Sequence, residues 1–156
     1  MIKKIEAVSE KLNRVTPYLI MSDANAAIEF YKKVFGAREL SRMTIINDKI
    51  GHAELQIGNA SVMLADEFPE WGMKGARTIG DSPVMLMLFV GDVDKVVSLA
   101  VESGAKILSP VQNQFYGDRS GSVEDPFGHK WTIASHVEDV SPEEMKKRAD
   151  MLFQKK

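Results

Sequence analysis

Two stretches of the chain repeat the same succession of apolar and polar positions. Residues 15–37 and 84–105 each begin with a short apolar run, continue with an aspartate and apolar residues at helical spacing, and end beside a glycine. Aspartate is a favoured helix N-cap because its carboxylate accepts free backbone N–H groups, and glycine suits the left-handed residue just past a helix. Each stretch therefore predicts a strand followed by a helix, with Asp23 and Asp92 as the caps.

Three short strand-like runs follow each predicted helix. They cover residues 39–46, 51–57 and 61–66 in the first half, and residues 106–112, 120–124 and 129–135 in the second. We therefore expect an α+β fold of two tandem βαβββ modules that form a curved mixed sheet around a cleft. The expected divisions are an N-terminal extension at 1–14, modules at 15–66 and 83–136, a linker or lid loop at 67–82, and a C-terminal helix at 137–156.

The last two predicted strands lie in the most distinctive segment, FYGDRSGSVEDPFGHKWTIASH at residues 115–136. Its centre, Asp125-Pro126-Phe127-Gly128, has the residues of a tight turn, since proline presets φ and glycine accepts the left-handed geometry that closes such turns. The segment therefore predicts a β-hairpin. Alternation along its second strand places Trp131 in the core, and His136 at the strand end is expected to meet water.

Composition narrows the class of protein. A chain of 156 residues favours one domain. It contains no cysteine, which excludes disulfides and thiolate metal sites and favours a cytoplasmic location. The formal net charge is −2 and the lysine pairs are interspersed with acidic residues, so no nucleic-acid partner is expected. No apolar run approaches the roughly 20 residues that span a bilayer, and the N-terminus lacks an apolar secretion signal.

Several segments carry more specific information than their pattern of apolar and polar positions. They are TPYLIMSDANAAIEFYKKVFGA at 16–37, GHAELQIGNASVMLADE at 51–67 and the hairpin segment at 115–136. In these segments the chain resembles the vicinal oxygen chelate superfamily, the glyoxalase/bleomycin-resistance/dioxygenase fold, and especially its PhnB-like branch. The resemblance implies paired βαβββ modules, a ligand-binding cleft and a homodimer.

Metal-using members of this superfamily place His or Glu at four strand positions on the cleft face. Aligned on the segments above, these positions fall at Thr16, at Leu64 or a neighbouring residue, at Met85 and at Thr132. None supplies the imidazole or carboxylate that a divalent cation requires. We therefore expect no cofactor at the usual place, and a divalent metal only at a non-standard site.

The first module carries the main catalytic candidates. His52, Glu54 and Gln56 alternate with apolar residues, so they share one face of a strand. If this face lines the cleft, His52 and Glu54 could act as proton donor and base or hold a relocated metal. The alternative is the solvated outer face of an antiparallel sheet.

Further residues are expected to contact a ligand because they carry hydroxyl, amide, soft apolar, aromatic or guanidinium groups near the predicted cleft. They are Thr16, Tyr18, Gln56, Leu64, Trp71, Met85, Met87, Tyr116, Arg119 and Thr132. Three alternatives stay open. The methionines would otherwise fill the core, Trp71 would anchor the surface of its own domain, and Arg119 would order its loop through an ion pair with Asp118.

The resemblance and these residues together favour a small-molecule-binding protein that sequesters a partly aromatic ligand in an apolar cleft. One alternative is a lyase or isomerase that transfers protons through His52 and Glu54. Another is a non-catalytic dimeric scaffold. The fold alone does not choose among them, because function resides in the site.

Overall fold

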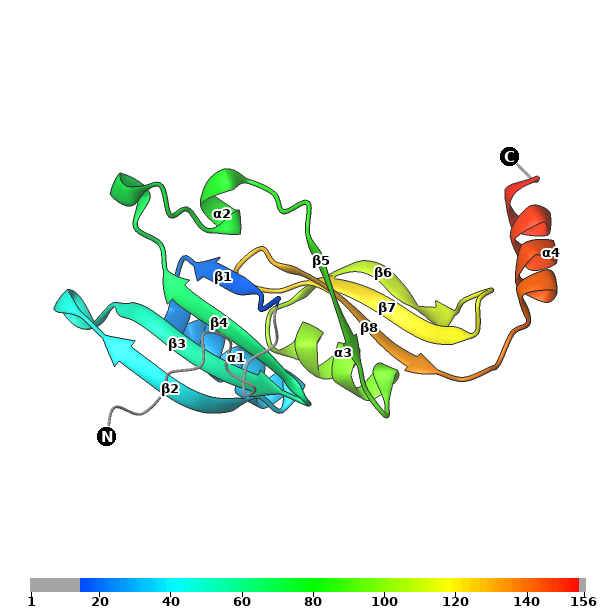
Figure 1. The fold of residues 1–156 in the computed structure, drawn as a ribbon, viewed down its shortest axis with the longest axis horizontal. Helices are drawn as coiled ribbons and strands as arrows, with labels where there is room; N and C mark the ends of the chain where they lie inside the picture. The colour runs from blue at the N-terminus through cyan, green and yellow to red at the C-terminus, as the bar shows by residue number, and fades with distance from the viewer. Residues whose placement is uncertain (1–14, 155–156) are drawn as a thin grey trace, which may run out of the picture. The chain divides into compact units, whose positions relative to one another are not determined.

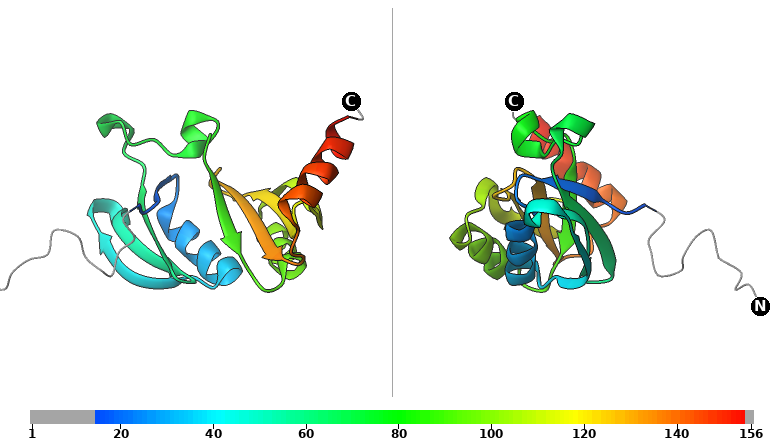
Figure 2. Two further views of the ribbon diagram at one scale, coloured as in Figure 1. Left: turned by 45° about the vertical axis from the view of Figure 1, so that its right-hand side comes forward. Right: turned by 90° about the vertical axis from the view of Figure 1, so that its left-hand side faces the viewer.

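A computed structural model describes residues 15–154, which form two compact units divided between Gly80 and Asp81. Each unit contains one four-stranded sheet and a helix that lies along one face of that sheet (Figure 1, Figure 2). The expected N-terminal extension at 1–14 lies outside the described residues. No helix within 15–154 combines the length and the apolar character needed to cross a membrane.

The first unit has the predicted βαβββ order. Its elements are β1 (Tyr18–Met21), α1 (Ala24–Phe35), β2 (Arg38–Thr44), β3 (Ile50–Ile57) and β4 (Ala60–Asp66), with a short 3₁₀ turn η1 (Ile46–Asp48) before β3. The strands lie in the order β1-β4-β3-β2, in which β1 runs parallel to β4 and the other pairs are antiparallel.

Local signals explain α1. The Asp23 carboxylate accepts a hydrogen bond from the Ala26 backbone N–H at 2.9 Å, as an N-cap does. Gly36 ends the helix in the left-handed conformation, with φ 64°. Between these ends, Ile28 and Tyr31 are fully buried against the sheet, so the helical spacing of apolar residues forms the packing face.

The second unit repeats the order and adds a helix. Its elements are β5 (Met85–Phe89), α3 (Val93–Glu102), β6 (Lys106–Asn113), β7 (Asp118–Glu124), β8 (Lys130–His136) and α4 (Pro142–Phe153). The strand order is β5-β8-β7-β6, again with one parallel pair. The predicted α+β fold of two repeated modules with a C-terminal helix is therefore confirmed, with one sheet in each unit.

The segment between β4 and β5 is more ordered than the loop expected there. It contains a 3₁₀ turn, η2 (Pro69–Trp71), and a short helix, α2 (Ala76–Ile79). The Glu67 carboxylate accepts hydrogen bonds from the Gly75 backbone N–H at 3.0 Å and from the Thr78 hydroxyl at 2.7 Å. This single carboxylate folds the segment back on itself, a contact between distant positions that no local pattern predicts.

The β7–β8 turn is organised by a buried carboxylate. Asp125 is fully buried and accepts hydrogen bonds from the backbone N–H groups of Phe127 and His129, both at 2.9 Å. Its other oxygen accepts from the indole Nε1–H of Trp131 at 3.0 Å. The aspartate therefore ties the turn to the core residue of the next strand, and Trp131 is buried as expected.

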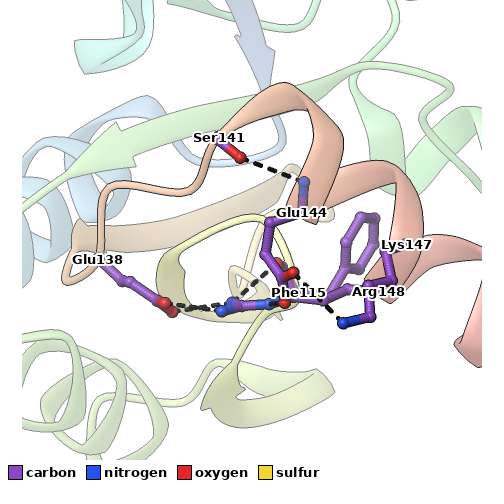
Figure 3. A network of polar contacts seen from close by, with 6 residues as sticks. All are labelled: Phe115, Glu138, Ser141, Glu144, Lys147 and Arg148. Carbon is purple, nitrogen blue, oxygen red and sulfur yellow. Dashed lines mark hydrogen bonds and ion pairs between the residues drawn. The ribbon is translucent and has the colours of Figure 1, made fainter.

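The C-terminal helix is attached through Arg148 (Figure 3). Its guanidinium donates to the two Glu138 carboxylate oxygens at 2.7 and 2.9 Å, to Glu144 at 2.9 Å and to the Phe115 carbonyl at 3.4 Å. The Ser141 hydroxyl accepts a hydrogen bond from the Glu144 N–H at 3.2 Å, as a helix N-cap does. Helix α4 is thus held against the β6–β7 loop of its own unit.

His136 ends β8 between two carboxylates. Its Nδ1 lies 3.0 Å from Asp118 and its Nε2 lies 2.8 Å from Asp139. More than half of the side chain is exposed, in line with the expected contact with water, and the imidazole also pairs with both carboxylates. The two carboxylates, Asp139 foremost, raise the pKa of the imidazole because they favour its cationic form.

Substituting Asp125 tests the role of the buried carboxylate in the turn. Asp125→Ala leaves three buried N–H donors without this acceptor, and each unpaired donor costs about 1–3 kcal/mol. The free energy of unfolding in urea is therefore expected to fall by about 3 kcal/mol or more. Asp125→Asn keeps an oxygen for the two backbone donors and should lose less; an Asp125→Ala protein as stable as the parent would contradict this role.

A proton NMR titration tests the environment of His136. Its pKa should lie above the ordinary value of about 6.5, and Asp139→Asn should move it back toward that value. Since the folded pKa is raised, the ion pairs stabilise the fold fully below about 6.5, and the stabilisation is lost as pH rises through the higher folded value. Asp150→Asn, which removes a carboxylate paired with Lys146, is the control; an unchanged His136 titration in Asp139→Asn would refute the assignment.

Candidate functional site

Each sheet has one face covered by its helix, and we call the opposite face its open face. On β3, Ala53 and Leu55 are fully buried on the α1 side. His52 and Glu54 alternate with them and keep 31% and 26% of their side-chain surface exposed. The expected separation of β3 into an apolar and a polar face is therefore confirmed, and the polar set lies on the open face.

The strand register places Tyr18 beside His52 and Glu54. Tyr18 of β1 and Glu54 of β3 both pair with Met63 of β4, so the three residues form one row across the open face. The Tyr18 hydroxyl lies 2.9 Å from Nδ1 of His52, and Nε2 of His52 lies 3.5 Å from Glu54 Oε1. Tyr18, His52 and Glu54 thus form a connected chain of polar groups, which we call the Tyr–His–Glu chain.

The partners of His52 determine its neutral tautomer. A carboxylate only accepts hydrogen bonds, so Nε2 carries the proton that points toward Glu54. Nδ1 is then the acceptor for the Tyr18 O–H. Partial burial raises the pKa of Tyr18 above its ordinary value, so the phenol keeps the proton that it donates. The hydroxyl oxygen retains a lone pair for a further hydrogen bond.

Two other predicted residues of the first unit occupy different surroundings. Gln56 lies on the open face, where its amide oxygen accepts from the Arg38 guanidinium. Leu64 is fully buried on the α1 side, so it does not contact a ligand on the open face. Its neighbour Met63 takes that place, because a shift of one residue along a strand reverses the face. Thr16 is half-buried just before β1.

The open face of the second sheet is apolar along its edge. Met85, Met87 and Phe89 alternate along β5 and are 49, 50 and 60% exposed. They do not fill the core, which removes the alternative expectation for the two methionines. Opposite Met87, Thr132 of β8 shares a hydrogen bond of 2.9 Å with Ser122 of β7. This face therefore offers soft apolar contacts beside a pair of hydroxyl groups.

The residues at the usual ligand positions do not fit the metal that the resemblance implies. Thr16 and Thr132 offer neutral hydroxyls, Met85 a thioether, and Met63, which replaces Leu64 on the open face, another thioether. These donors lack the charge or imidazole that holds a divalent ion. Within residues 15–154, no three His, Asp or Glu side chains converge as a metal-binding group elsewhere.

Arg119 is not on the open face. Its guanidinium binds Asp94 of α3 through two hydrogen bonds of 2.7 and 2.8 Å, and it also donates to Asn113. The alternation of β7 places Arg119 on the same side as buried Val123, toward α3. The expected partner Asp118 is wrong, since Asp118 binds His136. The ligand contact of Arg119 stays a prediction, and its guanidinium lies on the α3 side of the sheet. Its guanidinium lowers the pKa of Asp94.

The two predicted flanking aromatics lie in loops of different units. Trp71 stacks on Phe68 with ring centroids 5.1 Å apart, and Phe68 lies beneath the Lys49 ammonium group. Trp71 nevertheless stays 71% exposed, so one indole face is supported and the rest meets solvent. Tyr116 is half-buried in the loop before β7, where it packs edge-to-face on Phe115.

Local sequence patterns missed some residues of these faces. Met63 follows from the alternation of β4 once its register is known, and Phe89 continues the β5 stripe. The contact between Tyr18 and His52 joins positions 34 residues apart and depends on the parallel pairing of β1 with β4. Arg38 reaches Gln56 through the β2–β3 pairing, which carries no signal within either strand.

Comparison with known proteins identifies relatives over most of the chain. A family model described as the Glyoxalase/Bleomycin resistance protein/Dioxygenase superfamily matches residues 11–133. An uncharacterized protein of Mycobacterium bovis is 38% identical over 136 residues, which cover 84% of this chain and 88% of that protein.

Solved structures share the fold. TioX from Micromonospora sp. ML1 has a TM-score of 0.61 at 26% identity and covers 83% of this chain and all of its own. The PhnB protein of Bacillus cereus has a TM-score of 0.65 at 16% identity, over 79% of this chain and 99% of its own. At 16% identity, the similarity to the PhnB protein concerns the fold alone.

Proposed function

Since this chain belongs to the glyoxalase/bleomycin resistance protein/dioxygenase superfamily, we propose that it binds a small, partly aromatic molecule on the open faces of its sheets, without the usual metal centre. The observation that carries this proposal is the apolar stripe on β5. Met85, Met87 and Phe89 each expose about half of their surface on a single face. An aromatic ligand would remove that surface from water.

The free energy of burying the apolar stripe on β5 favours contact with a ligand over contact with water. Burying a large apolar side chain is worth about 1.5–3 kcal/mol relative to exposure, so covering even half of three such residues supplies useful affinity. Methionine suits this role because its flexible thioether adapts to irregular shapes and contacts aromatic rings well. The Ser122–Thr132 hydroxyl pair beside Met87 gives such a ligand a polar contact on the same face.

The first unit supports the same function with a different chemistry. Its open face presents the hydroxyl of Tyr18, the ring of His52, the carboxylate of Glu54 and the thioether of Met63. Hydrogen-bonding groups at fixed positions discriminate ligands that carry a matching polar atom. The open face of the first sheet can therefore recognise the polar atom of a partly aromatic ligand.

A matched pair of variants tests the apolar stripe, with 2-naphthol as the probe and isothermal titration calorimetry as the measurement. Met87→Lys places a charge on the open face of the second sheet and should weaken binding about tenfold or more. Ile107→Lys changes a residue of similar exposure on the α3 side of the same sheet, since Ile107 pairs with buried Val123. It should bind as the parent does; equal losses in both variants, or in neither, would contradict the proposal.

The Tyr–His–Glu chain favours a second candidate, a glyoxalase-like lyase or isomerase. The Glu54 carboxylate can act as the base that removes a proton from carbon next to a carbonyl, and the His52 Nε2–H can act as the proton donor. Incubation with 2-acetylnaphthalene in D₂O measures this directly, as deuterium entering the methyl group. Exchange that depends on protein and is lost in His52→Gln would favour the enzyme; exchange at the buffer rate favours binding alone. A protein that binds none of these aromatic probes would instead fit the scaffold.

A homodimer and a cytoplasmic location complete the proposal. The edge strand β5 supports the dimer, because an edge strand of five apolar residues is prone to pair with another chain. The molar mass in solution should then be twice the 17.4 kDa of one chain. The absence of cysteine fits a reducing compartment.

A further inference from the structure

The protons of the contact between Tyr18 and His52 are arranged according to the protonation state of His52. With His52 neutral, Nε2 carries the proton facing Glu54, and Nδ1 accepts from the Tyr18 O–H across 2.9 Å. The single phenolic proton is then committed to His52. A ligand that approaches Tyr18 finds only oxygen lone pairs, so it must bring a hydrogen-bond donor.

Protonation of His52 reverses this arrangement. Both ring nitrogens then carry protons, and the Nδ1–H must donate to the Tyr18 oxygen, since two donors cannot face each other. The phenolic O–H is released and can rotate toward a ligand. Because burial raises the pKa of Tyr18, the tyrosine remains a phenol throughout, and only the direction of its hydrogen bonds changes.

We infer that Tyr18 and His52 form a reversible recognition contact on the open face, which accepts a hydrogen bond from a ligand when His52 is neutral and donates one when His52 is protonated. This inference rests on the proposed binding function and names its ligand class. The ligands are planar aromatic molecules with one polar oxygen: phenols in the neutral state and ketones in the protonated state. No covalent step is involved.

The groups around His52 permit this switch. Glu54 on β3 is the acidic group that faces its Nε2, across 3.5 Å. Opposite His52 on β2 lies Met43, and Met63 on β4 lies beside Glu54, so neither neighbour adds charge. The Arg38 cation lies farther along the sheet, at Gln56.

Other charged groups at this end of the first sheet are engaged elsewhere. The Asp66 carboxylate binds the backbone N–H groups of Ala24 and Ile50. Lys49 donates to the Glu67 carbonyl and lies over the ring of Phe68. The protonation state of His52 is therefore linked most directly to Glu54 and Tyr18.

The test compares two uncharged probes with the same ring system, 2-naphthol as donor and 2-acetylnaphthalene as acceptor, by calorimetry between about pH 5 and 8, the range in which histidine titrates. As pH falls, the ketone should bind several-fold tighter and the naphthol several-fold weaker, so that their affinity ratio changes about tenfold. Tyr18→Phe and His52→Gln should each hold the ratio constant with pH. His136→Gln, which removes another titrating histidine, should leave the change in place.

Nitrogen-15 NMR of His52 adds a readout that needs no ligand. The neutral ring should carry its proton on Nε2, and Tyr18→Phe should alter the Nδ1 shift; a neutral ring protonated on Nδ1 overturns the inference. Probes whose affinities change in parallel with pH also overturn it but leave the binding function intact. Failure of both probes to bind at any pH removes the binding function and this inference together.

Discussion

A single helix covers one face of each four-stranded sheet, and the surroundings of each candidate residue on a strand depend on the face where it lies. Side chains of a strand alternate between its two faces. Leu64 and Val123 are therefore buried on the sides of α1 and α3, whereas Met63 and Met87 keep part of their surface on the open faces. Leu64 and Met63 are neighbours, yet one is fully buried and the other half-exposed. Moving the register of β4 by one residue would exchange their surroundings.

The fold was predictable because its signals are local. Asp23 and Asp92 both cap helices as expected, and the alternation of β3 and β5 distinguishes their two faces within each strand. The folded segment between β4 and β5 was not predictable, since its order depends on Glu67 reaching Gly75 and Thr78. Such contacts depend on the path of the chain rather than on its composition.

The candidate site was likewise predictable only where the signal lies within a single strand. The shared face of His52 and Glu54 follows from the spacing of two residues on one strand. The hydrogen bond between Tyr18 and His52 requires the pairing of β1 with β4, and the ion pair of Arg119 with Asp94 requires the packing of α3 on β7. Arg119 is adjacent to Asp118 in sequence, yet its guanidinium binds Asp94, which lies 25 residues away along the chain.

The two open faces differ in chemistry: the first sheet carries polar groups and the second sheet carries a soft apolar stripe. Methionine methyl NMR during titration with 2-naphthol tests this division most directly, because methionines lie on both kinds of face. The account predicts shifts at Met63, Met85 and Met87, which lie on open faces, and none at Met21, which is fully buried. Shifts at Met21 with the three open-face methyl groups unmoved would contradict it.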